Sequence, residues 1–175
     1  MDLNVPVTYR QALPRVWLRR VALRALDVAA PGEGCRLSVT LTDDDTVRAL
    51  NREYRGLDET TDVLAFSATH PGHWEGEGEP PNNFLGNGSK PTAQDAFILP
   101  PDEPEPVGEV VVSVPQAQRQ AVAAGHGLDR EVALLITHGV LHLVGHDHVD
   151  VEDTAAMQAK EREALSKVFA RAARV

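Results

Sequence analysis

The apolar and polar positions of this chain predict strands and helices in alternation. Apolar residues alternate with polar ones over 37–41, and a short strand is expected within 2–9. The apolar runs 63–66 and 110–112 are expected to be strands buried on both sides. Helical periodicity predicts helices over 14–30, 45–54, 115–124, from Asp129 through the histidine-rich segment to Gly145, and 151–172. About four strands and five helices in this order indicate an α+β domain.

The stretch 68–106 breaks the pattern. It is rich in Pro, Gly, Glu and Asn and has little apolar periodicity. We therefore expect a long loop inserted in a single domain that spans 1–175. Its seven carboxylates and one lysine give it a net charge of −6, out of −9 for the whole chain. We expect a surface excursion without chemistry, although so acidic a loop would also shield a cleft or repel RNA.

The composition excludes several classes of protein. With 42% hydrophobic and 25% charged residues, the chain has the balance of a soluble globular domain. Its start does not resemble a signal peptide, and no apolar stretch is long enough to span a bilayer. Cys35 is the only cysteine, so an internal disulfide is impossible and a reducing compartment is favoured. We expect a cytoplasmic protein without a membrane partner.

The net charge of −9 argues against a basic DNA-binding protein. The arginines nevertheless form two groups along the chain. Arg48, Arg52 and Arg55 follow one another at i, i+4 and i+7, which places them on one face of a helix and makes a phosphate-facing surface conceivable. The other group is near the start of the chain and is expected to be a solvated helix face. Its members are Arg10, Arg15, Arg19, Arg20 and Arg24.

Four of the seven histidines fall within 138–148. His138 and His142 are four residues apart, so both point the same way from one helix and can reach one zinc ion. Gly145 is expected to end that helix, which lets His148 turn back as the third ligand. His146 is the alternative third ligand if the helix continues. Three imidazoles leave one coordination position open, which is typical of a catalytic rather than a structural zinc site.

The histidine spacing matches the H-E-x-x-H-x-x-G-x-x-H frame of metzincin peptidases at every position but one. Gly139 stands where those peptidases have their catalytic glutamate, so the usual general base is missing. A metal ion alone still lowers the pKa of its water to near 7. Such a site suits a phosphodiester with an arginine nearby better than a peptide bond with its poor leaving group.

This histidine segment resembles the signature H-G-x-L-H-L-x-G-[YH]-D-H of the YbeY family of bacterial rRNA-maturation endoribonucleases, without a mismatch. Three upstream segments are similar to family motifs as well. They are Asn51 to Asp58, similar to N-x-x-Y-R-x-x-D; Thr61 to Phe66, similar to T-D-V-L-S-F; and Gly108 to Ser113, similar to G-D-I-x-I-S. Ala65 and Glu109 depart from these motifs, which have serine and aspartate there.

The resemblance implies a zincin-related fold with a mixed sheet of about four strands and the metal site on a central helix. It implies one Zn²⁺ per chain, bound by His138, His142 and His148, and an activity that depends on Arg55. It also implies single-strand-specific cleavage of rRNA, in 16S rRNA 3′-end maturation and ribosome quality control. The implied partners are ribosomal RNA and the small subunit, with ribosomal proteins or assembly GTPases.

Two other functions remain open from the residues alone. A metallopeptidase-like hydrolase is favoured by the zincin frame and opposed by Gly139. A ribosome-associated factor with a structural metal would need the metal for folding, which an open catalytic site does not. The residues name no proton donor for the leaving 5′-oxygen, and a second water would serve equally well.

Overall fold

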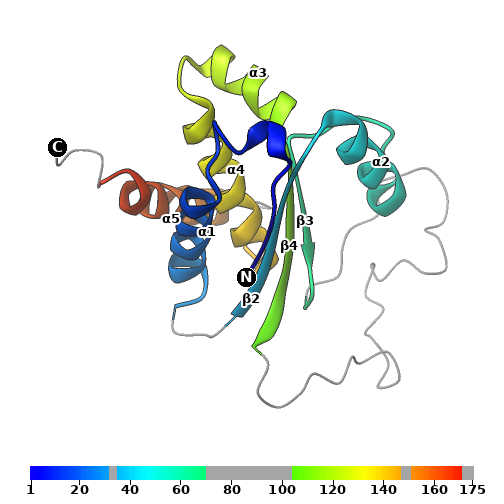
Figure 1. Cartoon of the computed structure of the whole chain (residues 1–175). Coiled ribbons are helices and arrows are strands. Elements are labelled where there is room, and N and C mark those ends of the chain that lie inside the picture. The colour runs from blue at the N-terminus through cyan, green and yellow to red at the C-terminus, as the bar shows by residue number, and fades with distance from the viewer. Residues whose placement is uncertain (32–34, 70–103, 147–150, 171–175) are drawn as a thin grey trace.

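The structure is a computed structural model that describes residues 1–31, 35–69, 104–146 and 151–170 (Figure 1). A four-stranded sheet forms its centre, in the order β1-β2-β4-β3. The strands are β1 (Asp2–Asn4), β2 (Cys35–Thr42), β3 (Val63–Ser67) and β4 (Glu105–Ser113). β1 pairs with β2 and β2 with β4 in parallel, whereas β3 pairs with β4 antiparallel. The α+β fold with a mixed sheet is therefore confirmed.

Helices cover the two faces of the sheet unequally. On one face, α1 (Arg15–Ala29), α4 (Leu128–Leu143) and α5 (Val151–Phe169) pack against one another (Figure 1). Their apolar sides close the main core against alternate residues of β2 and β4, such as Val39 and Val110. On the other face, α2 (Asp44–Arg55) covers a smaller cluster of Val47, Leu64 and Val111. α3 (Val114–Ala124) directly follows β4 and leads to α4.

Most predicted elements are confirmed within a few residues, and the differences have physical causes. Val7–Tyr9, expected within the first strand, is a 3-10 turn, since Pro6 precedes it and provides no N–H for a ladder. β4 begins at Glu105, inside the expected loop, and residues 70–103 of that loop lie outside the described residues. The prediction that 63–66 is buried on both sides is wrong, because β3 is an edge strand of the described sheet and Ala65 is exposed.

The helix ends show which local signals operate. The Asp43 carboxylate accepts a hydrogen bond from the Thr46 N–H at 2.9 Å and so caps the N-terminus of α2. α4 has Gly127 at its N-cap. Asp129 lies in the first turn of α4, where the helix dipole favours a negative charge.

In the part of the chain that the structure describes, no helix is long and apolar enough to cross a membrane.

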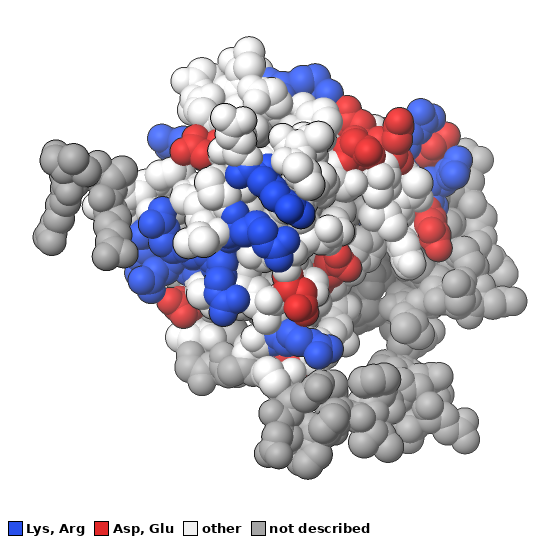
Figure 2. All heavy atoms as spheres, viewed as in Figure 1, with Lys and Arg blue, Asp and Glu red and all other residues white. Residues whose placement is uncertain are grey.

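Charge is distributed unevenly over the surface. On the face shown in Figure 2, basic side chains gather over α1 and the neighbouring helix surface, whereas acidic and basic side chains are mixed around α2. The helix α1 carries four arginines and one acidic residue, Asp27. A chain with a net charge of −9 thus contains one basic surface.

Candidate metal centre

The central helix α4 lies unusually close to the sheet at Gly139. A Cβ atom at this position would lie 2.8 and 3.0 Å from the two Cγ atoms of Val110 in β4, and 3.4 Å from Val63 Cγ2 in β3. These contacts leave no room for a side chain, so glycine is needed for this approach. The missing glutamate of the peptidase frame therefore has a packing cause: position 139 faces the sheet.

His138 and His142 lie side by side on the flank of α4. Their Nε2 atoms are 3.1 Å apart, and the ring centroids are separated by 4.7 Å with the rings near perpendicular. The i, i+4 spacing predicts this juxtaposition, and the structure has it. Both rings are half-buried, so their nitrogens are accessible from outside the core.

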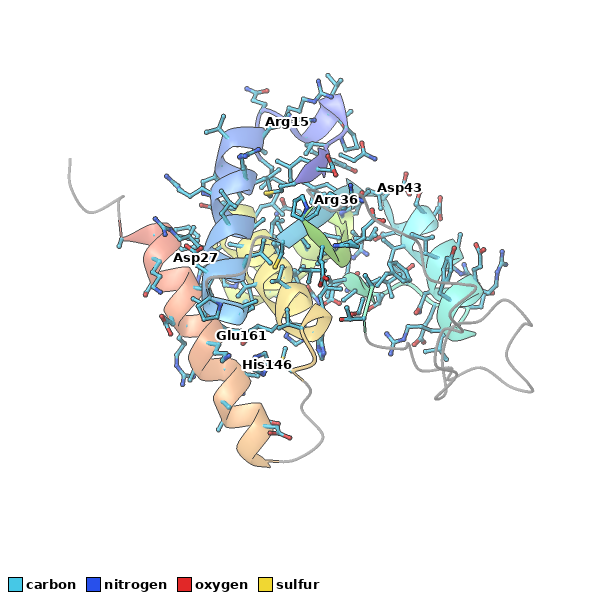
Figure 3. All side chains as sticks on the ribbon, turned by 90° about the horizontal axis from the view of Figure 1, so that it is seen from below. Arg15, Asp27, Arg36, Asp43, His146 and Glu161 are labelled. Atoms are coloured by element: carbon cyan, nitrogen blue, oxygen red, sulfur yellow. The ribbon has the colours of Figure 1, made fainter. Side chains whose placement is uncertain are left out.

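Glu161 of α5 orients the first imidazole. Its Oε1 lies 2.8 Å from His138 Nδ1, and the carboxylate is largely buried (Figure 3). A carboxylate that accepts the Nδ1 proton leaves the Nε2 lone pair available for a metal ion and raises the basicity of the ring. The sequence did not indicate this contact, because nothing in the periodicity of α5 distinguishes Glu161 from the acidic residues around it.

The two histidines fit a tetrahedral metal site. Metal–nitrogen bonds of 2.0–2.1 Å at tetrahedral angles place two ligand nitrogens about 3.3 Å apart, close to the distance between these Nε2 atoms. Within the described ranges, no third His, Cys, Asp or Glu joins them to complete a metal-binding group. The predicted third ligand, His148, and its neighbour Asp147 lie outside the described residues, so their roles stay predictions.

Gly145 ends α4 as expected. Its φ is +84°, its N–H donates to the His142 carbonyl at 3.0 Å, and the His146 N–H donates to the Leu141 carbonyl at 3.0 Å. These two hydrogen bonds form a Schellman motif, in which glycine takes the left-handed conformation without steric cost. His146 has thus left the helix and does not occupy an i+8 position on the histidine face.

His146 instead contacts Lys160 of α5, whose Nζ donates to His146 Nε2 at 2.9 Å (Figure 3). Burial lowers the pKa of His146, the Lys160 charge lowers it further, and Asp153 opposes both. The contact engages Nε2 of His146, and His148 as the third ligand stays a prediction.

Removing the carboxylate behind His138 is expected to weaken metal binding without unfolding the protein. For Glu161→Ala we expect a 10–100-fold rise in the metal Kd, the usual effect of losing such a partner. Competition with a chromogenic chelator measures the affinity. Glu163→Ala is the matched control, because Glu163 is exposed on the same helix and pairs with Lys167. Equal affinities of the two variants would refute the orienting role of Glu161.

The predicted catalytic residue Arg55 is the last residue of α2 and is half-buried. α2 packs mainly against β3, β4 and α3, so placing Arg55 beside the histidines stays a prediction.

The neighbours of Arg55 in the segment 51–58 have structural roles. The side-chain amide of the buried Asn51 donates a hydrogen bond to the Glu59 carbonyl at 2.9 Å. The backbone carbonyl of Asn51 accepts a hydrogen bond from the Leu57 N–H. Tyr54 packs edge-on against Phe66 with ring centroids 5.1 Å apart.

The arginine face predicted on α2 is partly occupied by an ion pair. Arg48 Nε and Nη2 donate to the two carboxylate oxygens of Asp58 at 2.9 and 3.1 Å, and Arg52 lies 4.0 Å from the same group. The Arg48 hydrogen bond holds the pKa of Asp58 below its usual value. Arg48 therefore binds Asp58 in the loop after α2, and its guanidinium is less available to a phosphate than the spacing indicated.

Comparison with known proteins decides the family. A family model described as Endoribonuclease YbeY matches residues 8–169. A protein named Endoribonuclease YbeY from Dehalococcoides mccartyi is 36% identical over 170 residues, 96% of this chain and 90% of that protein. One of the same name from Symbiobacterium thermophilum is 42% identical over 151 residues, covering 85% and 83% of the two chains. The chain belongs to the YbeY family.

A solved structure agrees with the fold of this YbeY-family chain. The solution structure of a Thermotoga maritima protein superposes with a TM-score of 0.57 at 19% identity, covering 97% of this chain and 89% of that one. At this identity the likeness concerns the fold alone.

Two positions where the chain departs from the YbeY motifs lie on different faces of the sheet. Glu109 accepts a hydrogen bond from Thr40 Oγ1 at 2.7 Å. Because Val110 meets Gly139 of α4 and strand side chains alternate, Glu109 points to the other face, away from the histidines. Ala65 is on the α4 side and exposed, and the neighbouring Ser67 hydroxyl donates to the Leu143 carbonyl at 2.8 Å.

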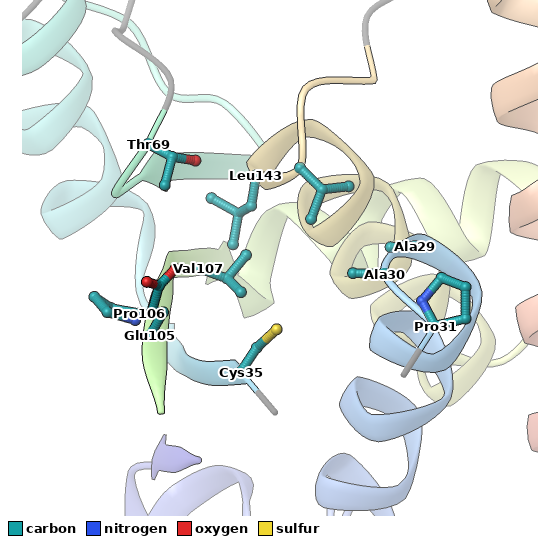
Figure 4. A pocket seen from close by; sticks show the side chains of 10 residues that line it. Ala29, Ala30, Pro31, Cys35, Thr69, Glu105, Pro106, Val107 and Leu143 are labelled. Carbon is teal, nitrogen blue, oxygen red and sulfur yellow. The ribbon is translucent and has the colours of Figure 1, made fainter. Parts of the chain in front are cut away.

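A pocket of about 620 Å³ lies beyond the C-terminal end of α4 (Figure 4). Cys35, Val107 and Leu143 are among the residues that line it, with Glu105 and Thr69 as polar groups. Its described lining contains no histidine, although Leu143 directly follows His142.

Proposed function

We propose that this protein is a zinc-dependent, single-strand-specific endoribonuclease that hydrolyses phosphodiester bonds of ribosomal RNA. One observation carries the site assignment: two imidazoles on α4 have their Nε2 atoms 3.1 Å apart, with a carboxylate 2.8 Å behind the first. Membership in the YbeY family, whose model is described as an endoribonuclease, supports the reaction class. His148 is proposed as the third ligand.

The residues of this chain would share the chemistry as follows. A divalent metal ion at His138, His142 and His148 would supply Lewis acidity and lower the pKa of a coordinated water to near 7. Glu161 holds the His138 ring and its tautomer. Arg55 would neutralise the phosphate charge that grows in the transition state. No described side chain is assigned as proton donor to the leaving 5′-oxygen, and water is proposed for this step.

The proposed biological setting is the maturation of the 16S rRNA 3′ end and the quality control of ribosomes. The proposed partners are the small ribosomal subunit and, more specifically, ribosomal proteins or assembly GTPases. A cytoplasmic location is part of the proposal, and the single Cys35 is consistent with it.

The packing of α4 opposes a peptidase. A glutamate beside the first histidine would need space that Val110 and Val63 occupy. A general base at that position is therefore excluded, and a peptide bond with its poor amine leaving group would have to be cut without it.

Parallel assays separate the functions. The purified protein is incubated with a single-stranded rRNA fragment and with casein, each with and without a chelator. We expect chelator-sensitive cleavage of the RNA and none of casein, and RNA products without 2′,3′-cyclic phosphate, because water and not the 2′-hydroxyl attacks. Cleavage of casein would favour the peptidase. Unfolding by the chelator, with no cleavage of either substrate, would favour a structural metal.

A further inference from the structure

The exposed face of α1 has four arginines and few acidic partners. Arg15, Arg19 and Arg24 are exposed and Arg20 is half-buried. Arg24 pairs with Asp27 at 3.0 Å, on an exposed surface where the pair is weak. In residues 1–31, 35–69, 104–146 and 151–170, no carboxylate forms an ion pair with Arg15, Arg19 or Arg20. The face therefore keeps most of its positive charge.

Apolar side chains lie between these arginines. Successive helical residues are about 100° apart around the axis, so Arg15 and Arg19 form one edge of the face and Arg20 and Arg24 the other. Val16 and Leu23, which are 84% and 42% exposed, lie between the two edges, and Asp27, which pairs with Arg24, lies there one turn after Leu23. A solvated helix face would have polar residues at positions 16 and 23. Two basic edges with an apolar centre are typical of a surface that binds a polyanion with flat apolar groups, as single-stranded RNA is.

Arg20 adds an observation of another kind. Its Nε is buried and has no hydrogen-bond partner among the described residues. Because Nε is covered, an anion on the exposed face would bind the Nη groups of Arg20 and not this atom. Arg48 differs, because Asp58 already satisfies its guanidinium.

The position of α1 links this face to the metal centre. α1 packs against both α4, which carries His138 and His142, and α5, which carries Glu161. The α1 face and the histidines therefore belong to one layer of packed helices.

We propose that Arg15, Arg19, Arg20 and Arg24, with Val16 and Leu23, form a second RNA-binding surface that holds substrate phosphates away from the cleavage site. This inference rests on the proposed endoribonuclease function. The surface contributes affinity for long rRNA and takes no part in the bond cleavage.

The test compares long and short substrates. Arg15→Glu/Arg19→Glu is assayed on an rRNA fragment of several tens of nucleotides and on an oligonucleotide of a few nucleotides around the cut. We expect the KM for the long RNA to rise about tenfold or more at 0.1 M salt, with kcat unchanged. The salt dependence of kcat/KM should fall in slope by about 1.4, since each phosphate contact to a single strand contributes about 0.7. Kinetics on the short RNA and metal content should not change.

The single variant Arg19→Glu is assayed as well, with Arg130→Glu as its control of equal charge change. Arg130 is exposed in the first turn of α4, and the change in net charge is the same. Unchanged KM and salt slope in the α1 variants, with active wild-type protein, would overturn the α1 proposal alone. Loss of binding to vesicles of anionic phospholipid, with normal rRNA kinetics, would overturn it in favour of a membrane surface. A wild-type protein that cleaves neither RNA would overturn the endoribonuclease assignment and, with it, this role of α1.

Discussion

His142→Ala is expected to remove the bound metal and to lower rRNA cleavage by at least about 10³-fold, because water of unperturbed pKa is almost never ionised at neutral pH. The Nε2 atoms of His138 and His142 are 3.1 Å apart, and one nitrogen alone cannot hold the ion in place. Elemental analysis of the purified variant measures the metal, and gel analysis of an rRNA fragment measures the cleavage. The fold should persist, since both rings are only half-buried.

Two further variants assign the third ligand. His148→Ala should lose the metal as His142→Ala does. His146→Ala should keep it, because His146 Nε2 contacts Lys160 and the Schellman turn has ended α4 before this residue. The reverse result would exchange the two assignments. Metal retained at full occupancy in His142→Ala would refute the α4 site altogether.

Gly139→Glu is expected to destabilise the protein severely and to create no peptidase activity, although the variant sequence would match the metzincin motif at every position. The Cβ alone would lie 2.8 Å from Val110 Cγ1. A carboxylate there would be buried without a partner, which costs about 4 kcal/mol or more of unfolding free energy. For a domain of this size such a loss lowers Tm by about 8–16 °C. Thermal denaturation followed by circular dichroism measures the effect, and casein remains uncut.

Gly139→Ala separates the steric effect from the charge. Overpacking costs about 1–3 kcal/mol, and the better helix propensity of alanine returns about 1 kcal/mol. We expect a smaller loss of Tm than for Gly139→Glu. Arg130→Glu is the exposed control on the same helix and should change Tm little. A Gly139→Glu protein as stable as wild type would show that α4 can move away from the sheet, which would invalidate the packing account.

Local patterns were enough to predict the helices and the histidine pair. The 3.6-residue period of α4 determines that His138 and His142 share a face, and the backbone freedom of Gly145 determines where the helix ends. Both effects act within one or two turns, so neighbouring residues contain the required information. The family motifs extended this to the fold class, since they cover three further segments of the chain.

Contacts between distant segments could not be predicted in this way. The sequence presented Arg48, Arg52 and Arg55 as a phosphate-binding face, but Asp58 pairs with Arg48 and lies 4.0 Å from Arg52, which balances one of these charges. It presented the arginines of α1 as an ordinary solvated face. Three of these four arginines, Arg15, Arg19 and Arg20, form no ion pair with the described part of the chain. Which charges remain available depends on loop closure and helix packing, and neither follows from residue spacing.

The sequence by itself determined that His138 and His142 share one face of a helix that ends at Gly145, because helical spacing and glycine conformation are local properties. Only the tertiary structure decided why Gly139 is a glycine, which carboxylate orients His138 and which arginines keep their charge. Each of these depends on atoms that are distant in the chain and brought together by the core: Val110 beneath α4, Glu161 of α5 beside it, and Asp58 folded back onto α2.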